Sequence, residues 1–175
     1  MKELLNLSRD TIVKYLKGEE IEVSEEVKKK YSKKQACFVT FTKKEVLRGC
    51  IGSLYARQEL WKDVVENSIN AGFKDIRFPP LRQEELNKIK IEISILTVPK
   101  KLEFRNPDEL LKKINSNQGV ILQNGMKSAT FLPQVWGQIP DKQDFLEHLS
   151  LKAGLEEAAW KTADIWVYEV EKISE

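Results

Sequence analysis

Hydrophobic and polar residues alternate most regularly between residues 89 and 96, where the sequence reads IKIEISIL. The four isoleucines fall on one face of an extended chain, which is typical of a strand with one buried face. Two more strands are predicted before it. ACFVTF (36–41) is rich in β-branched and aromatic residues, and VLRGCI (46–51) returns after the turn TKKE.

Apolar residues recur at helical spacing in two longer segments. The first begins near the N-terminus and ends before Gly18, and the second runs from Glu59 to Ile76, where the prolines of FPPL forbid its continuation. Shorter helices are predicted over residues 24–33, where Ser24 is a good N-cap, over 107–114, and from Asp141 to Gly154.

The remaining strands follow in the second half of the chain. GVILQNGMKSATFL (119–132) predicts a hairpin around Asn124-Gly125, and DIWVYEV (164–170) predicts a last strand. Because short turns join neighbouring strands and helices lie between the pairs, we expect an α+β fold, with a mainly antiparallel sheet flanked by helices. No repeat or linker divides the sequence, so residues 1–175 are predicted to form a single domain, with room for two lobes.

Composition narrows the function classes. The 29 lysines and arginines nearly balance 27 acidic residues, and a net charge of +2 gives no reason to expect binding to nucleic acid. No apolar run is long enough to span a membrane, and no signal peptide is apparent, so we expect a cytoplasmic protein without a membrane interaction, as a monomer or homodimer. Two cysteines and one histidine cannot form a closed zinc site, and we predict neither a metal nor a cofactor.

Five segments resemble motifs of one protein family. They occur in the same order as in that family and cover nearly the whole chain. They are LRGCIGSL (47–54), FKDIRFPPL (73–81), IEISILT (91–97), FLPQVW (131–136) and FLEHLSLKAGL (145–155). The sequence is thereby similar to the AMMECR family, whose signature the hexapeptide LRGCIG matches. The resemblance implies an α+β fold with a larger and a smaller lobe, a cleft lined by the signature, and no assigned activity. It also implies a shared pathway with Memo-like proteins and radical SAM proteins.

The segment LRGCIG carries the best candidate chemistry. In a regular strand Arg48, Cys50 and Gly52 share one face, with the first two Cα atoms about 6.6 Å apart. A guanidinium at that range would favour a thiolate, and Gly49 and Gly52 would let a ligand approach. Alternatively, both glycines serve the backbone and Cys50 packs as a small apolar residue, because most free cysteines do.

Four other residues are candidates for the same site. Asp75 and Arg77 lie on a corner stiffened by two prolines, where they could pair with each other or, alternatively, Arg77 could join Arg48 in an anion pocket. Glu92 could reach Arg48 or accept a proton near the thiol, or face solvent on the polar side of its strand. Gln134, after Pro133, could line a cleft.

Two function classes remain open: an enzyme, and a binding module whose occupant is either a small ligand or a protein. A thiol-dependent transferase or hydrolase would use Cys50 as nucleophile, Asp75 or Glu92 as acid or base, and Arg48 and Arg77 to hold an anion. A ligand-binding domain would hold a small molecule or peptide in the same cleft, and a non-catalytic interaction or scaffold module would bind a protein there. No complete set of nucleophile, base and orienting group is visible, which favours binding.

The turn between the first two strands decides whether the cysteines can meet. Two-residue hairpins prefer residues that tolerate positive φ, so we predict a three-residue loop over 43–45, with Phe38 facing Cys50 and Cys37 on the opposite side of the sheet. Both thiols should then be free. The resemblance implies a left-handed residue at Glu45, where the family usually has glycine.

Overall fold

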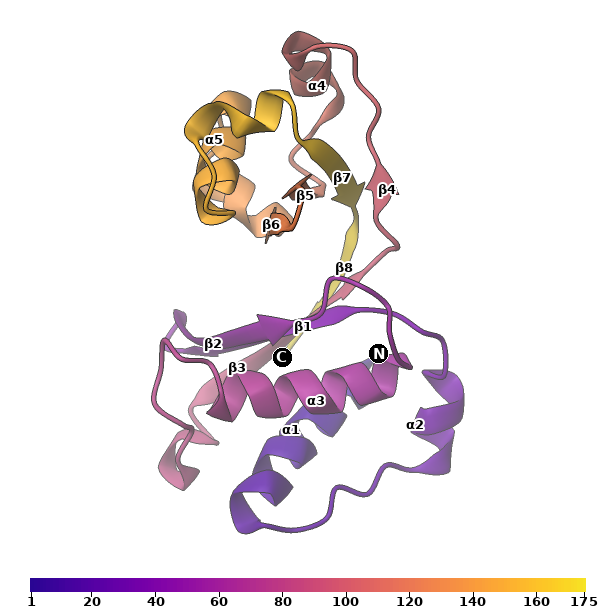
Figure 1. The fold of residues 1–175 in the computed structure, drawn as a ribbon. Helices are drawn as coiled ribbons and strands as arrows, with labels where there is room; N and C mark the ends of the chain where they lie inside the picture. Colours follow the sequence, from indigo (N-terminus) through magenta and orange to yellow (C-terminus); the bar gives the residue numbers. More distant parts are fainter. The chain divides into compact units, whose positions relative to one another are not determined.

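The computed structural model describes residues 1–175 and divides them into two compact units, each built around a four-stranded sheet (Figure 1). The first unit contains Met1–Leu96 and Glu171–Glu175, and the second contains Thr97–Val170. The predicted α+β class is confirmed. None of the helices combines the length and apolar character needed to cross a membrane.

The first unit contains three α-helices and a sheet with the strand order β2-β1-β3-β8. Its elements in chain order are α1 (Lys2–Lys17), α2 (Glu25–Lys30), β1 (Cys37–Lys43), β2 (Val46–Gly52), α3 (Leu60–Phe73), the 3-10 helix η1 (Gln83–Glu85), β3 (Ile89–Leu96) and β8 (Val170–Ser174). The predicted helix and strand types agree with this order, whereas β8 as a separate strand was not predicted. DIWVYEV spans two strands, because the chain leaves the second sheet after Tyr168 and returns to the first.

Helices α1 and α3 lie on the same face of the first sheet (Figure 1). That face carries the isoleucines of β3 that the hydrophobic pattern predicted to be buried, together with alternate residues of β1, and the core is formed between them and the helices. Its fully buried members include Ile12 of α1, Val39 and Phe41 of β1, and Ile91 and Ile93 of β3. The opposite face of the sheet, called here the open face, carries the other set of alternate residues.

The second unit has its own core around a sheet with the order β4-β7-β5-β6. Its elements are β4 (Lys100–Lys101), α4 (Pro107–Lys113), β5 (Gly119–Asn124), β6 (Lys127–Phe131), the 3-10 helices η2 (Pro133–Gly137) and η3 (Glu157–Lys161), α5 (Lys142–Lys152) and β7 (Asp164–Tyr168). Trp136 stacks on Phe145 in this core, with ring centroids 3.6 Å apart. It therefore contributes to packing.

The predicted three-residue turn between β1 and β2 is wrong. The turn has two residues, Lys44 with φ 52° and Glu45 with φ 62°, both left-handed. The left-handed residue at Glu45 is as the resemblance implied, although neither turn residue is glycine. A bulge between Phe41 and Thr42 leaves Arg48 without a partner in the register. Cys50 therefore faces Thr40 and not Phe38.

The hairpin of the second unit also departs from its expected turn. Asn124 pairs with Lys127, so the two turn residues are Gly125 and Met126. Only Gly125 has a positive φ, of 61°. A glycine at the first central position suits a type II′ turn, whereas the Lys44-Glu45 turn has the two positive φ values of type I′. The dipeptide that suggested type I′ thus begins one residue before the turn.

The two cysteines lie on opposite faces of the first sheet, and both are unpaired, as predicted. Cys37 belongs to the face covered by α1 and α3 and is completely buried, while Cys50 is half-buried on the open face. Since cross-strand neighbours share a face, the pairing of Cys50 with Thr40 keeps its thiol away from Cys37.

Candidate functional site

Cys50 lies on an edge strand, and two side chains complete its backbone hydrogen bonding. Its N–H donates to Oδ2 of Asp75 at 2.9 Å, and its carbonyl oxygen accepts from Nη2 of Arg77 at 3.0 Å. Arg77 also donates to Asp75, from Nε at 2.9 Å and from Nη2 at 2.7 Å. Asp75 and Arg77 therefore form a clamp on the edge of β2, in place of a neighbouring strand.

The clamp explains the electrostatics of Asp75. The hydrogen bonds from Arg77 are the main reason that the pKa of this carboxyl is lowered to about 2, against the effect of burial. Both carboxylate oxygens accept hydrogen bonds. The group is thus ionised and fully engaged at neutral pH, which suits an edge clamp better than an acid or base.

The thiol of Cys50 is not activated by Arg48. Burial raises the pKa of Cys50, and the counteracting influences come from the Thr40 hydroxyl and the Arg77 charge. Thr40 Oγ1 donates to Sγ at 3.2 Å. The expectation that Arg48 lowers this pKa is wrong, and at neutral pH the thiol is mainly protonated.

Arg48 binds a carboxylate, that of Glu85, and not the thiol of Cys50. The bulge takes it out of the alternation, and its guanidinium forms a two-pronged pair with Glu85 of η1, from Nε at 3.0 Å and Nη2 at 2.9 Å. Lys43, which lies on the helix-covered side, donates to the same carboxylate at 2.9 Å. The predicted sharing of one face by Arg48 and Cys50 is therefore wrong, and Arg48 and Arg77 have separate carboxylate partners.

Glu85 is strongly stabilised as an anion. Its hydrogen bonds with Arg48, and then with Lys43, lower its pKa to about 2 although the group is largely buried. The guanidinium of Arg48 also lies 5.9 Å from the ring of Phe78. These contacts tie the bulge in β2 to the segment that precedes β3.

Glu92 lies on the same face as Cys50, with Thr40 between them. Thr40 pairs with Cys50 on one side and with Glu92 on the other, which places the three side chains in one row across β2, β1 and β3. Lys172 of β8 extends the row through an ion pair with Glu92 at 2.5 Å. We call this set, Cys50, Thr40, Glu92 and Lys172, the polar row.

The glycines of the segment serve close packing. A Cβ on Gly49 would lie 2.2 Å from the backbone oxygen of Ala71, so α3 can approach β2 only because that atom is missing. A Cβ on Gly52 would lie 2.3 Å from the ring of Phe38, its cross-strand partner. Both observations favour the alternative in which the glycines serve the backbone.

The remaining candidate belongs to the other unit. Gln134 is exposed on η2, among residues of the second unit. His148, the only histidine, is exposed on α5, where its Nδ1 lies 2.8 Å from the carbonyl oxygen of Asp144. No group of three His, Cys, Asp or Glu side chains is arranged to hold a metal ion.

The structure adds a buried carboxylate that sequence reasoning missed. Asp63 of α3 is 2% exposed and accepts hydrogen bonds from the backbone N–H of Cys37 and from the side chains of Ser53, Gln58 and Asn67, at 2.8 to 3.2 Å. The sequence did contain a sign of this buried polar cluster, because Asp63 and Asn67 are polar residues spaced by four on the apolar side of a helix.

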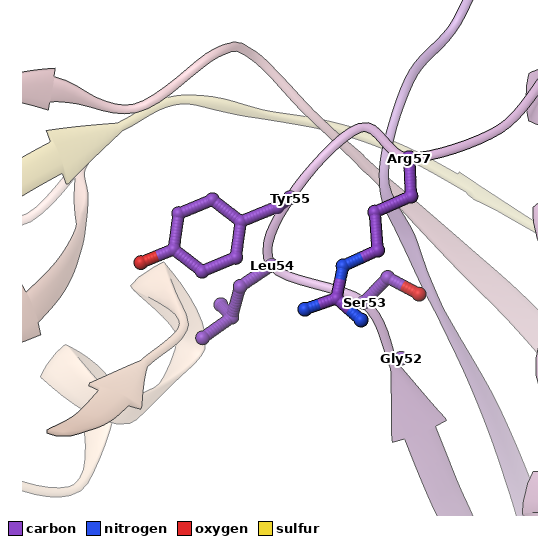
Figure 2. Close-up of a pocket in the computed structure, with 5 residues that line it drawn as sticks. All are labelled: Gly52, Ser53, Leu54, Tyr55 and Arg57. Atoms are coloured by element: carbon purple, nitrogen blue, oxygen red, sulfur yellow. The ribbon is translucent and has the colours of Figure 1, made fainter. Parts of the chain in front are cut away.

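The loop held by Asp63 borders an open hollow of about 310 Å³. It is lined by Gly52, Ser53, Leu54, Tyr55 and Arg57, beginning where β2 ends (Figure 2). Figure 2 shows the guanidinium of Arg57 directed between Leu54 and Ser53, with the Tyr55 ring on the far side of Leu54. Sequence reasoning did not select Tyr55 or Arg57.

The fold and the site together define a class: α+β proteins of two units, in which the first sheet has one helix-covered face, one partly polar face and a clamped edge. The AMMECR1 family matches residues 5–173 of this chain. A protein of Nanoarchaeum equitans is 37% identical and one of Methanopyrus kandleri 40% identical, covering 95% and 98% of this chain and 95% and 86% of their own lengths. The chain therefore belongs to the AMMECR1 family.

A solved structure supports the same assignment. The crystal structure of an uncharacterized protein from Pyrococcus horikoshii superposes with a TM-score of 0.92, at 32% sequence identity, over 99% of this chain and 90% of that one. Because that protein is uncharacterized, its structure shows the fold of the family and no activity.

Proposed function

We propose that this protein is a ligand-binding domain that holds a small molecule or peptide without a covalent bond, on the open face of its first sheet. The observation that carries the proposal is the polar row. It offers a thiol, a hydroxyl, a carboxylate and an ammonium group within one line of strand-paired residues, on the face that α1 and α3 do not cover. These groups can both donate and accept hydrogen bonds.

The state of Cys50 supports binding over covalent catalysis. A nucleophilic cysteine works as its thiolate and is usually activated by a neighbouring base or cation. Here burial raises the thiol pKa, Arg48 is paired with Glu85, and Asp75 is occupied by the clamp. The groups that would make Cys50 an effective nucleophile have other partners.

Capture of metabolites tests the proposal. Purified protein is incubated with a cell extract, washed, and the retained molecules are identified by mass spectrometry. We expect a retained compound that the double variant Thr40→Val, Glu92→Gln loses and that Asp164→Asn, which removes an exposed carboxylate of the second unit, retains. Equal retention by the double variant would contradict the proposal.

Two observations favour a thiol-dependent transferase or hydrolase as a second candidate. The hydroxyl of Thr40 donates to Sγ of Cys50, and the charge of Arg77 also favours the thiolate. Intact-protein mass spectrometry of the extract-treated protein distinguishes this candidate, because an acyl or alkyl intermediate adds mass that Cys50→Ser does not acquire. Retention of the compound by Cys50→Ser, with no added mass on the parent protein, supports non-covalent binding.

An interaction or scaffold role would use a different feature of the same region. Ile76 is fully exposed between the two clamp residues Asp75 and Arg77, and an exposed apolar side chain on a rigid corner suits a protein contact. The family resemblance suggests Memo-like and radical SAM proteins as the partners to test. Co-purification that Ile76→Ser abolishes would support this role, whereas co-purification unaffected by the change would place any contact elsewhere.

A further inference from the structure

We propose that the loop formed by residues 53–58 is a second binding site, for a small organic anion that joins a carboxylate or phosphate group to a flat, apolar body. The site is the hollow lined by Gly52, Ser53, Leu54, Tyr55 and Arg57 (Figure 2). Its volume of about 310 Å³ lies at the lower end of the range of small-molecule sites. It uses none of the polar row, so the two proposals can fail separately.

Arg57 supplies the charge. Its side chain is exposed and makes no hydrogen bond or ion pair within the protein, in contrast to Arg48 and Arg77, whose guanidinium groups are bound to carboxylates. A guanidinium offers a planar fork of donors that matches a carboxylate or a phosphate. Because Arg57 has no partner to give up, an anion can bind it without breaking a contact of the folded protein.

Tyr55 and Leu54 supply the surface for the body of the ligand. The Tyr55 side chain is 47% exposed on the loop, and its ring flanks Leu54 in the hollow (Figure 2). An exposed aromatic ring beside an aliphatic side chain favours a flat apolar group, which gains by stacking and by burial. A ligand with both an anionic end and a ring therefore uses more of this site than an inorganic anion does.

The loop is held in place before any ligand arrives. The hydroxyl of Ser53 and the side-chain amide of Gln58, near its two ends, donate to the same oxygen of the buried Asp63 at 2.9 and 3.2 Å. Within the loop, the N–H of Arg57 donates to the carbonyl oxygen of Tyr55 at 2.9 Å. A site whose backbone is fixed in advance loses less conformational freedom on binding.

Titration of the ¹⁵N-labelled full chain tests the inference with four probes: phenyl phosphate, benzoate, inorganic phosphate and uncharged benzyl alcohol. We expect phenyl phosphate or benzoate to shift the backbone amide signals of residues 52–58, with inorganic phosphate and benzyl alcohol each binding at least about tenfold more weakly. The tighter of the first two probes identifies the anion as phosphate or carboxylate.

Variants of exposed loop residues assign the contacts. Arg57→Gln should weaken binding of the tighter probe by about tenfold or more, since it removes a charge-assisted hydrogen bond, and Tyr55→Leu should weaken it several-fold while Tyr55→Phe does not. Arg105→Gln, which removes an exposed arginine of the second unit, is the matched control and should change nothing. Unchanged binding by Arg57→Gln, or signal shifts confined to residues outside 52–58, would overturn the proposal.

Discussion

The two faces of the first sheet are made by the same strands and yet differ in the chemistry of their side chains. On the face beneath α1 and α3, Val39, Phe41 and Ile93 are completely buried in one apolar core. On the open face, the neighbouring positions Thr40 and Glu92 belong to the polar row. Alternation along a strand thus places apolar side chains in the core and polar side chains on the opposite face, without any change of backbone.

The largest difference between the faces should appear when a buried side chain is shortened. Ile93→Ala should lower the free energy of unfolding by about 4 kcal/mol, because it removes buried carbons and leaves a cavity under the helices. Thr42→Ala, on the open face, should cost less than about 1 kcal/mol. Urea unfolding of both variants measures the contrast, and equal losses would show that both faces are packed alike.

A buried and an exposed ion pair should differ in how much they contribute to stability as the pH changes. The pKa of Glu85 is lowered to about 2 in the folded protein, so its ion pair stabilises the fold above the ordinary pKa near 4.5 and is lost as the pH falls from there toward 2. The contribution is about 3 kcal/mol, since the pair with Arg48 is nearly buried.

Unfolding at pH 7 and pH 3 tests this contribution. Glu85→Gln should be less stable than the parent protein at pH 7, and the gap should narrow at pH 3. Glu45→Gln is the control, because the pair between Glu45 and Lys90 is exposed and should contribute less than about 1 kcal/mol at either pH. A gap for Glu85→Gln that stays constant with pH would show that the pair does not govern acid stability.

A single added methyl group should distinguish close packing from open space. Gly49→Ala should cost about 2 kcal/mol, because its Cβ would collide with the backbone oxygen of Ala71 on α3. Gly137→Ala is the same substitution at a glycine with no atom within 4 Å, and it should be neutral within about 0.5 kcal/mol. Thermal unfolding of both variants gives the comparison, and a harmless Gly49→Ala would mean that α3 can move away from β2.

The smallest effect concerns reactivity, with no change in stability. Brief iodoacetamide treatment should label Cys50 before Cys37, because Cys37 is completely buried and burial raises its pKa well above the ordinary value. Cys50 itself should react more slowly at pH 7 than a free cysteine in solution, and faster as the pH rises, since its pKa is also raised. Mass mapping of the labelled peptides checks both statements, and label on Cys37 first would contradict the assignment of the faces.

Local pattern was sufficient to predict most elements of the fold. The alternation of IKIEISIL gives strand β3 with its bounds and its buried face, and Asp141 and Gly154 frame α5 as N-cap and left-handed terminus. The turn at Lys44-Glu45 was missed because nothing in those two residues favours positive φ. The contact of Arg48 with Glu85, 37 residues away, accompanies the bulge, and such a contact cannot be read from the hairpin alone.

The candidate site was predictable only where strand pairing determined it. Cys50 and Glu92 share a face because both pair with Thr40, and the sequence placed them together only on the condition that their strands shared one sheet. The roles of the two arginines depend on their carboxylate partners in the folded protein. Arg48 pairs with Glu85, and Arg77 pairs with Asp75. Charge and spacing along the sequence did not distinguish an anion pocket from an edge clamp.

Strand β8 also influences how the protein can fold during synthesis. The ribosome makes residues 97–170 after three strands of the first sheet and before most of the fourth, so the second unit can fold while β3 lacks its outer neighbour. At ~5–20 residues per second, these residues take roughly 4–15 s to make. During that interval the nascent chain presents the unpaired backbone edge of β3, which is where a chaperone that captures extended strands would bind.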